Sequence, residues 1–193
     1  MPVSGLTPEL ARLLRPCKRR RAAHDSGPRR AVDVRHVVLH STEGGTAASV
    51  AAFFAGSAQA STQLVVDDRE CYRCLPDLVI PWGAPGINRS GLHVEHCGFA
   101  RWPAREWHEH EAMLDRSAAK VARWTWQYGI PVRFVEAAAL RAGRTGITTH
   151  AQASIAFPPN DGHTDPGDGF PIAHYLLRVQ RYRRELAAER ASR

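Results

Sequence analysis

The chain has 193 residues, enough for one domain with a short appendage, and its 44% hydrophobic content is typical of a globular protein. No apolar run reaches the roughly 18 to 20 residues that cross a bilayer, which excludes a membrane-spanning helix. The 26 Lys and Arg residues against 19 Asp and Glu residues give a formal net charge of +7. This charge favours an anionic partner, such as a nucleic acid, an acidic membrane surface or an acidic cell-wall polymer, and does not choose among them.

The N-terminus lacks the pattern of a secretory signal, because no apolar segment follows the basic run "RPCKRRR". We therefore expect the protein to be cytoplasmic when it is made. Disulfides are rare in that compartment, so the four cysteines, Cys17, Cys71, Cys74 and Cys97, are expected to be free thiols.

The first 32 residues divide into a short helix and a basic arm. The stretch "LTPELARLLR" predicts a helix with Thr7 as its cap, Pro8 at its first position and an apolar stripe of leucines. The following "RPCKRRRAAHDSGPRR" is basic and poor in apolar residues, which is typical of a mobile arm. Every candidate catalytic residue lies after Val32, so residues 1–30 are expected to be dispensable for action on small soluble substrates.

Strands and a helix follow the arm. The β-branched run "VDVRHVVLH" predicts a central strand that ends at His40, and "TAASVAAFFAG" predicts a helix capped by Thr46. The stretch "TQLVVDDRECYRCLP" predicts a hairpin that turns at Asp67 and Asp68, and "LHVEHC" predicts a further strand.

The second half of the chain contains two long helices and a short strand. Apolar residues at helical spacing predict a helix from about Arg105 to Tyr128, and "GITTH" predicts a strand that ends at His150. The stretch "PIAHYLLRVQRYRRELAAER" predicts an amphipathic last helix. The whole pattern predicts an α/β protein with a mixed central sheet flanked by helices. Its main domain would be residues 33–180, and residues 181–193 would be the basic end of the last helix.

Three candidate metal ligands, His40, His150 and Asp165, lie at or just beyond predicted strand ends. Strand ends on one edge of a sheet can converge although they are far apart in sequence. Two imidazoles and a carboxylate suit Zn²⁺ and leave the fourth tetrahedral position to water. Each residue alone has a plainer interpretation, as a packing residue or, for an Asp before Pro-Gly, as a turn former.

Two other motifs resemble metal sites but lack the partners that such sites need. The stretch "CYRC" has zinc-knuckle spacing, but no second pair follows, and its two thiols in a strand would point to opposite faces. The stretch "HVE", residues 93–95, matches the H-x-E of zinc deaminases, but the P-C-x-x-C that should follow is absent. Neither is interpreted as a metal site.

Five stretches follow one another in an order that resembles a known family: "VVLHSTEGG", "STQLVVDDRECYRCLPD", "PWGAPGIN…GLHVEHCG", "GITTH" and "HTDPGDGFP". They resemble the type 2 N-acetylmuramoyl-L-alanine amidases, whose superfamily includes phage lysozymes and peptidoglycan-recognition proteins. The likeness covers about residues 33–179 and is greatest to amidase domains of endolysins from phages of actinobacteria. It implies the amidase/peptidoglycan-recognition-protein fold and hydrolysis of the amide bond between N-acetylmuramic acid and L-alanine in peptidoglycan.

The resemblance also implies roles for single residues. The family's zinc ligands fall on His40, His150 and Asp165, and its catalytic glutamate falls on Glu95 of "HVE". Glu95 would take a proton from water and pass it to the leaving amine. His163 would donate a hydrogen bond to the oxyanion. The plainer interpretations are a solvent-facing strand carboxylate for Glu95 and a turn residue outside the site for His163.

The sequence departs from the family pattern at two places in the cleft. Many relatives have a histidine where Gly83 stands, and phage lysozymes often have Tyr-His where Thr62 and Gln63 stand. These departures leave the metal ligands intact. His93 shares a strand face with Glu95 and is expected to line the cleft, with no assigned role.

Three other functions stay open. A non-catalytic peptidoglycan-binding module would have lost a metal ligand, whereas all three positions are intact. A cytoplasmic amidase that recycles soluble muropeptides would keep the ligands, but the basic arm favours intact anionic cell wall. A nucleic-acid-binding protein would explain the charge and none of the five motifs. We expect a monomeric enzyme that reaches the wall, for which phage lysis machinery is one route, and whose arm contacts an anionic wall polymer.

Overall fold

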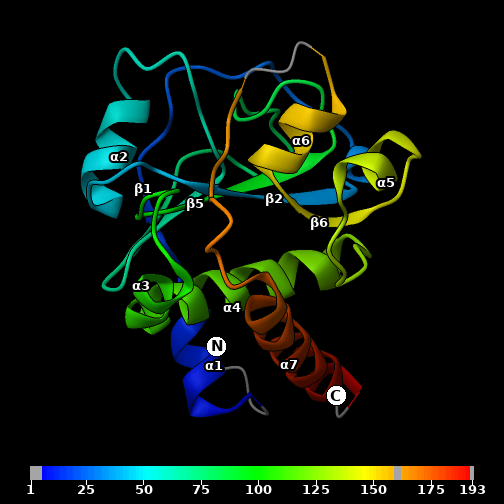
Figure 1. Ribbon diagram of the computed structural model, residues 1–193. Helices are drawn as coiled ribbons and strands as arrows, with labels where there is room; N and C mark the ends of the chain where they lie inside the picture. Colours follow the sequence, from blue (N-terminus) through cyan, green and yellow to red (C-terminus); the bar gives the residue numbers. More distant parts are fainter. Residues whose placement is uncertain (1–5, 159–161, 192–193) are drawn as a thin grey trace.

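The computed structural model describes residues 6–158 and 162–191 and shows one mixed sheet with helices on both faces (Figure 1). Its six strands lie in the order β1-β4-β3-β5-β2-β6. In chain order they are β1 (Lys18–Arg19), β2 (His36–Ser41), β3 (Leu64–Val66), β4 (Cys71–Arg73), β5 (Gly91–His96) and β6 (Gly146–Thr149). Strands β3, β5, β2 and β6 run parallel, while β4 is antiparallel to β3 and carries β1 on its outer edge.

Seven α-helices of the described residues cover this sheet. They are α1 (Pro8–Leu13), α2 (Ala47–Phe54), α3 (Ala104–Glu109), α4 (Glu111–Gln127), α5 (Ala137–Arg141), α6 (His150–Ala156) and α7 (Ile172–Ala191). Helices α1, α3, α4 and α7 lie below the sheet in Figure 1, and α2, α5 and α6 lie above it. None of the described helices is both long and apolar enough to cross a membrane.

The two faces of β2 explain where functional side chains can lie. Val37 and Leu39 point into the main core, which includes residues of α4 and α7. Val38 points the other way, into a smaller cluster with residues of α5 and α6. Because side chains alternate along a strand, His40 lies on the Val38 face. The β2–β5 register pairs His40 with Glu95, so both side chains are on this upper face.

Most of the predicted elements are present, including the strand through His40 and the hairpin of β3 and β4. The predicted caps are confirmed, since the side chains of Thr7 and Thr46 accept hydrogen bonds from the first turns of α1 and α2. The single helix predicted from Arg105 to Tyr128 is wrong, because α3 and α4 are separate and meet at His110.

The break between α3 and α4 has a long-range cause. The carboxylate of Asp68, in the β3–β4 turn, accepts a hydrogen bond from the backbone N–H of Met113 in the first turn of α4 (3.0 Å). It also lies 2.6 Å from the imidazole Nδ1 of His110. A carboxylate at this position satisfies free N–H groups of a helix N-terminus, so it stabilises a new start there.

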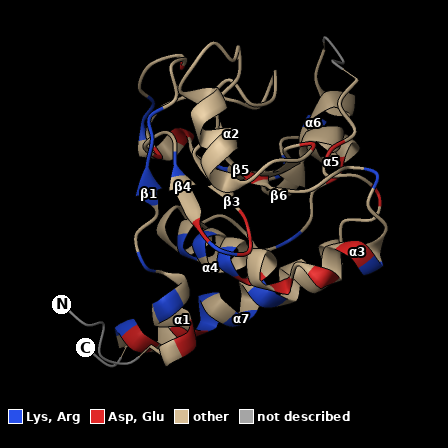
Figure 2. Cartoon of the chain, turned by 90° about the vertical axis from the view of Figure 1, so that its left-hand side faces the viewer, with Lys and Arg blue, Asp and Glu red and all other residues tan. Residues whose placement is uncertain are grey.

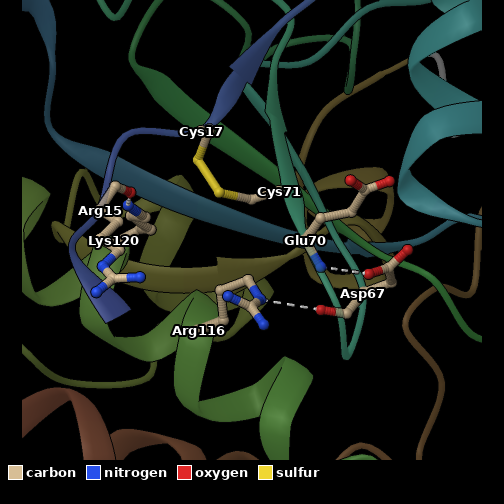
Figure 3. Close-up of a disulfide and its surroundings, with 7 residues drawn as sticks. All are labelled: Arg15, Cys17, Asp67, Glu70, Cys71, Arg116 and Lys120. Carbon is tan, nitrogen blue, oxygen red and sulfur yellow. Dashed lines mark hydrogen bonds between the residues drawn. A yellow bond between two sulfur atoms is a disulfide. The ribbon is translucent and has the colours of Figure 1, made fainter. Parts of the chain in front are cut away.

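The predicted mobile arm is wrong for the residues that join α1 to β2. Lys18 and Arg19 form β1, and Cys17 makes a disulfide with Cys71 of β4 (Figure 3). The expectation of four free thiols is therefore also wrong, since only the buried Cys74 and Cys97 are free. A strand of two residues has no periodicity that the sequence could reveal. The division of the chain at residue 32 stays a prediction.

Arg29 fixes the end of this N-terminal segment inside the protein. Its side chain is buried, and its guanidinium donates five hydrogen bonds of 2.6 to 3.0 Å to the backbone carbonyls of Asp77, Asn88, Arg89 and Gly91. Burial lowers the pKa of Arg29 to about 10, so the group stays charged at neutral pH. One buried cation thus connects the N-terminal segment to two loops and to the start of β5.

Replacing Arg29 with alanine should lower the free energy of unfolding by about 3 kcal/mol, because several buried carbonyl oxygens lose a charged donor. Urea unfolding followed by tryptophan fluorescence measures the loss. The matched control is Arg30→Ala, whose side chain is 78% exposed and pairs only with Asp33 among the described residues. That control should leave stability almost unchanged, and equally small losses in both variants would contradict the packing described for Arg29.

Candidate metal centre and active site

The three predicted ligands come together at one edge of the sheet. His40 is the second-last residue of β2, His150 opens α6 directly after β6, and Asp165 lies in the loop before α7. Because β2 and β6 are adjacent and parallel, their C-terminal ends lie side by side. The three side chains are buried, and their candidate ligand atoms all lie within 4.8 Å of one another.

Asp165 lies between the two histidines. Its Oδ2 is 3.1 Å from Nδ1 of His40, and its Oδ1 is 3.1 Å from Nδ1 of His150. Burial by itself would raise the pKa of Asp165, but its contacts with His150 and His40 outweigh burial and hold the pKa below its usual range. Two imidazole nitrogens and an ionised carboxylate thus face a common point, which is a donor set suited to Zn²⁺.

The loop around Asp165 is held by backbone contacts. The carbonyl of Asp165 accepts the N–H of Ala151 in the first turn of α6 (3.0 Å). Gly167 has φ 89°, and a Cβ there would overlap with the carbonyl of Ala100. Only glycine fits this turn, which keeps the ligand loop against the sheet. Asp161, at the beginning of the motif, lies outside the described residues.

Glu95 faces the same three ligands from β5. Its Oε1 is 3.9 Å from Nδ1 of His40, and its side chain is only 13% exposed. Its Oε2 is buried and has no hydrogen-bond partner among the described residues. Burial, together with the negative charges of Asp165 and Glu43, raises the pKa of Glu95 well above its usual range. This environment differs from that of a solvent-facing strand carboxylate and is typical of functional sites.

His163 lies at the mouth of the same site. Its ring stacks on His150 with a centroid distance of 4.0 Å, and its Nδ1 is 3.2 Å from Oδ1 of Asp165. About half of the side chain is exposed, and it lines the cleft above the ligands. The structure therefore brings His163 into the site, and the interpretation as a turn residue outside it does not fit.

A cleft of about 470 Å³ opens above these residues. Its floor carries the ligand cluster and Glu95. One wall is formed by Phe53 and Phe54 of α2 and by Trp82. Phe53 is 61% exposed, which is unusual for a large apolar side chain and leaves it available to a ligand. A polar floor beside an apolar wall is the usual composition of a ligand site.

The structure adds to or corrects the sequence analysis at two residues near the site. Trp82 is held at the cleft by the N-terminal segment, since its Nε1 donates to Oγ of Ser26 (2.8 Å) and its ring stacks on His24. His93 was expected to line the cleft but is fully buried beneath His40 instead. Both depend on contacts between residues that are distant in sequence.

A second group of possible ligands, His108, Glu111 and His174, lies near the surface of α3, α4 and α7. Arg178 already forms an ion pair with Glu111 and donates a hydrogen bond to Nε2 of His174. A guanidinium therefore occupies the place that a cation would take. We do not interpret this group as a metal site.

Comparison with known proteins places the chain in a family. Residues 30–168, which include all the candidate ligands and Glu95, match the family model described as N-acetylmuramoyl-L-alanine amidase, Amidase_2. No curated protein matches the sequence.

Solved structures share the fold. PlyL has a TM-score of 0.60 at 15% identity, over 85% of this chain and 96% of that chain. The Staphylococcus aureus hydrolase AmiA, in complex with its ligand, has a TM-score of 0.66 at 14% identity, over 89% of this chain and 85% of that chain. The endolysin N-acetylmuramoyl-L-alanine amidase LysCS from Clostridium intestinale has a TM-score of 0.56 at 13% identity, over 86% of this chain and 96% of that chain.

At these identities the structures bear on the fold alone, and the predicted mixed α/β architecture is confirmed. The family model is a separate finding and spans most of the sequence. The chain therefore belongs to the N-acetylmuramoyl-L-alanine amidase family Amidase_2.

Proposed function

We propose that this chain is a zinc-dependent amidase of the endolysin type. It would hydrolyse the amide bond between the lactyl group of N-acetylmuramic acid and L-alanine of the peptidoglycan stem peptide. The observation that carries the proposal is the buried cluster of His40, His150 and Asp165 on the floor of an open cleft. A complete ligand set favours an enzyme over a peptidoglycan-binding module that lacks a metal.

The residues fit the zinc ion that the family implies. His40, His150 and Asp165 would hold it, because their donor atoms converge and none of the described lysines or arginines lines the cleft. Zn²⁺ in such a site acts as a Lewis acid that polarises a carbonyl group and makes water more acidic.

Glu95 would move the proton that the reaction requires. It lines the cleft beside the ligands, and its Oε2 has no competing hydrogen bond among the described residues. It would take a proton from the attacking water and deliver it to the amide nitrogen as the C–N bond breaks. The products would be the free lactyl carboxylate and a stem peptide with a free L-alanine amino group.

His163 would stabilise the carbonyl oxygen as it gains negative charge, because its ring lies at the cleft mouth against His150. We expect His163→Ala to lower kcat about a hundredfold, the lower end of the range for loss of an oxyanion donor. The zinc content should be unchanged, as measured by metal analysis beside steady-state kinetics. The control is His108→Ala, a surface histidine of similar exposure remote from the cleft. Full activity of the His163 variant would remove it from the mechanism.

A direct test of the function uses a soluble muramyl peptide. The protein should release a peptide with a new amino group, detected with an amine-reactive dye. A strong chelator should abolish the release and added Zn²⁺ should restore it. Binding of the substrate without release, in the zinc-loaded protein, would favour a binding module instead.

We further propose that the intact cell wall, rather than soluble fragments, is the substrate. Lys and Arg residues gather along β1 and on α4 (Figure 2). Arg19, Arg20 and Arg123 are exposed and have no ion-pair partner among the described residues. We call these three residues the basic edge. Two surface grooves are lined by Arg19 together with Arg73, and one of them also by Arg123. Such a surface suits an anionic wall polymer.

One further observation supports an extracellular target. The Cys17–Cys71 disulfide holds β1 against β4, and disulfides persist outside reducing compartments. Four statements remain predictions from the sequence. They are synthesis in the cytoplasm, release by phage lysis machinery, an origin in phages of actinobacteria, and a monomeric state. Deleting residues 1–30 does not isolate the effect of charge, because it also removes Arg29 and the support of Trp82.

The sharper test replaces the basic edge with serine at all three positions. At low salt we expect about tenfold slower lysis of whole walls, because a charged surface raises the encounter rate, and unchanged turnover of the soluble muramyl peptide. The difference should fade in salt as the Debye length falls to about 8 Å at physiological ionic strength. The matched control removes equal charge at Arg69, Arg105 and Arg184, which are exposed elsewhere. Equal loss of wall lysis in both triple variants would contradict a specific basic edge.

A further inference from the structure

We propose that His93 is a positioning residue for the metal centre. It accepts a hydrogen bond from Nε2 of His40. This bond fixes the tautomer that leaves Nδ1 of His40, the nitrogen that faces the site, without a proton. The inference rests on the proposed zinc site and adds to it a residue to which the sequence analysis assigned no role. His93 touches neither the cleft nor the substrate, so it would act only through His40.

The geometry assigns different tasks to the two nitrogens of His40. Its Nδ1 faces Asp165 at 3.1 Å, and its Nε2 lies 2.9 Å from Nδ1 of His93. A histidine binds a metal through an unprotonated nitrogen, so ligation through Nδ1 places the proton of the neutral ring on Nε2. That N–H then needs an acceptor, and Nδ1 of His93 is in place to be one.

The surroundings of His93 hold its ring in one position. The ring lies between Gly83 and Gly91: a Cβ at Gly83 would overlap with Nδ1 of His93, and a Cβ at Gly91 would lie 2.7 Å from its Nε2. The backbone N–H of His93 donates to Oε1 of Gln63 (2.8 Å), and its carbonyl accepts the hydroxyl of Thr62 (2.9 Å).

His93 contacts the residues at both places where the sequence departs from the family pattern. Thr62 and Gln63 bond the backbone of His93, and Gly83 lies against its ring. Of these three positions, Gly83 is the one that bears on the imidazole itself. The absence of a side chain at Gly83 provides the space that the ring of His93 fills.

Packing alone does not account for a histidine at this position. Its Nε2 is buried and has no hydrogen-bond partner among the described residues. A buried polar atom without a partner lowers stability, and an apolar side chain of similar size would avoid that cost. The contact with His40 is what a phenylalanine could not provide. Partners that bond the second nitrogen of a ligand histidine typically strengthen metal binding 10- to 100-fold.

The test compares the zinc dissociation constants of four variants by competition with a chromogenic chelator. His93→Phe keeps the ring but removes the acceptor, and zinc binding should weaken about 10- to 100-fold. His93→Asn keeps an acceptor near the position of Nδ1 and should bind within a few-fold of wild type. Gly83→Ala displaces the ring of His93 and should weaken binding in the same direction as His93→Phe.

The matched control is His36→Phe. His36 is a buried histidine on the same face of β2, bonded to Ser90 and to the carbonyl of Arg144, and it does not contact the ligands. Its replacement should leave zinc affinity unchanged. In the zinc-loaded wild type, ¹⁵N NMR of the histidine rings should place the proton of His40 on Nε2.

The possible outcomes separate this inference from the proposed function. Zinc binding by wild type that is unchanged in His93→Phe, or weakened equally in His93→Asn, overturns the role of His93 and leaves the metal site standing. A wild-type protein that binds no zinc overturns both. If His93→Phe fails to fold, the comparison of Gly83→Ala with His36→Phe and the NMR tautomer still decide the question.

Discussion

Purified His150→Ala protein should contain almost no zinc and show no measurable amidase activity, whereas wild type should hold about one zinc ion per chain. Removal of His150 leaves one imidazole and one carboxylate, which is too few protein ligands for an open catalytic site. Elemental analysis of dialysed protein measures the metal, and release of amino groups from a muramyl peptide measures the activity.

The control for this experiment is His108→Ala, because His108 belongs to the second group of possible ligands. Its loss should change neither zinc content nor activity, since Arg178 occupies that group. If zinc stayed in the His150 variant and were lost from the His108 variant, the metal would be bound by this second group. That result would contradict the proposed active site.

Glu95→Gln should retain zinc and stability but lose about 10²- to 10⁴-fold in kcat, because the amide keeps the shape of the side chain and cannot transfer the proton. The side chain makes no hydrogen bond through Oε2 among the described residues, so an amide there breaks no existing contact at that atom. Steady-state kinetics, metal analysis and urea unfolding are measured on the same preparation.

A neighbouring carboxylate provides the comparison. Glu43 also lines the cleft, but its Oε1 accepts hydrogen bonds from the hydroxyl of Ser41 and the N–H of Ala100, both at 2.8 Å. Glu43→Gln should therefore have a much smaller effect on kcat than Glu95→Gln. Near-normal turnover of Glu95→Gln with unchanged zinc would show that Glu95 is structural.

The parts of the fold that the sequence predicts are those with a local pattern. The strand through His40 is a run of β-branched residues, and the helix after it begins at a threonine that caps it in the structure. The convergence of His40 and His150 follows from a general property of parallel strands, whose ends share one edge of the sheet. Asp165 lies in the loop before α7 and follows no strand directly, so its place beside the two histidines does not follow from this property.

The parts that the sequence does not predict depend on distant contacts. The break before α4 is stabilised by Asp68, more than forty residues earlier in the chain. The basic segment after α1 looks like a mobile arm because its packing depends on a disulfide and on Arg29. The acceptors of Arg29 are backbone carbonyls, which leave no trace in the side-chain sequence.

The most direct test of the central claim is mass spectrometry of peptidoglycan digested by the purified, zinc-loaded protein, with Glu95→Gln as the inactive comparison. We predict stem peptides with new free L-alanine amino termini, together with glycan strands whose N-acetylmuramic acid residues carry free lactyl carboxylates. New reducing sugar ends, or new ends within the stem peptide and none at L-alanine, would contradict the assignment of this chain as an N-acetylmuramoyl-L-alanine amidase.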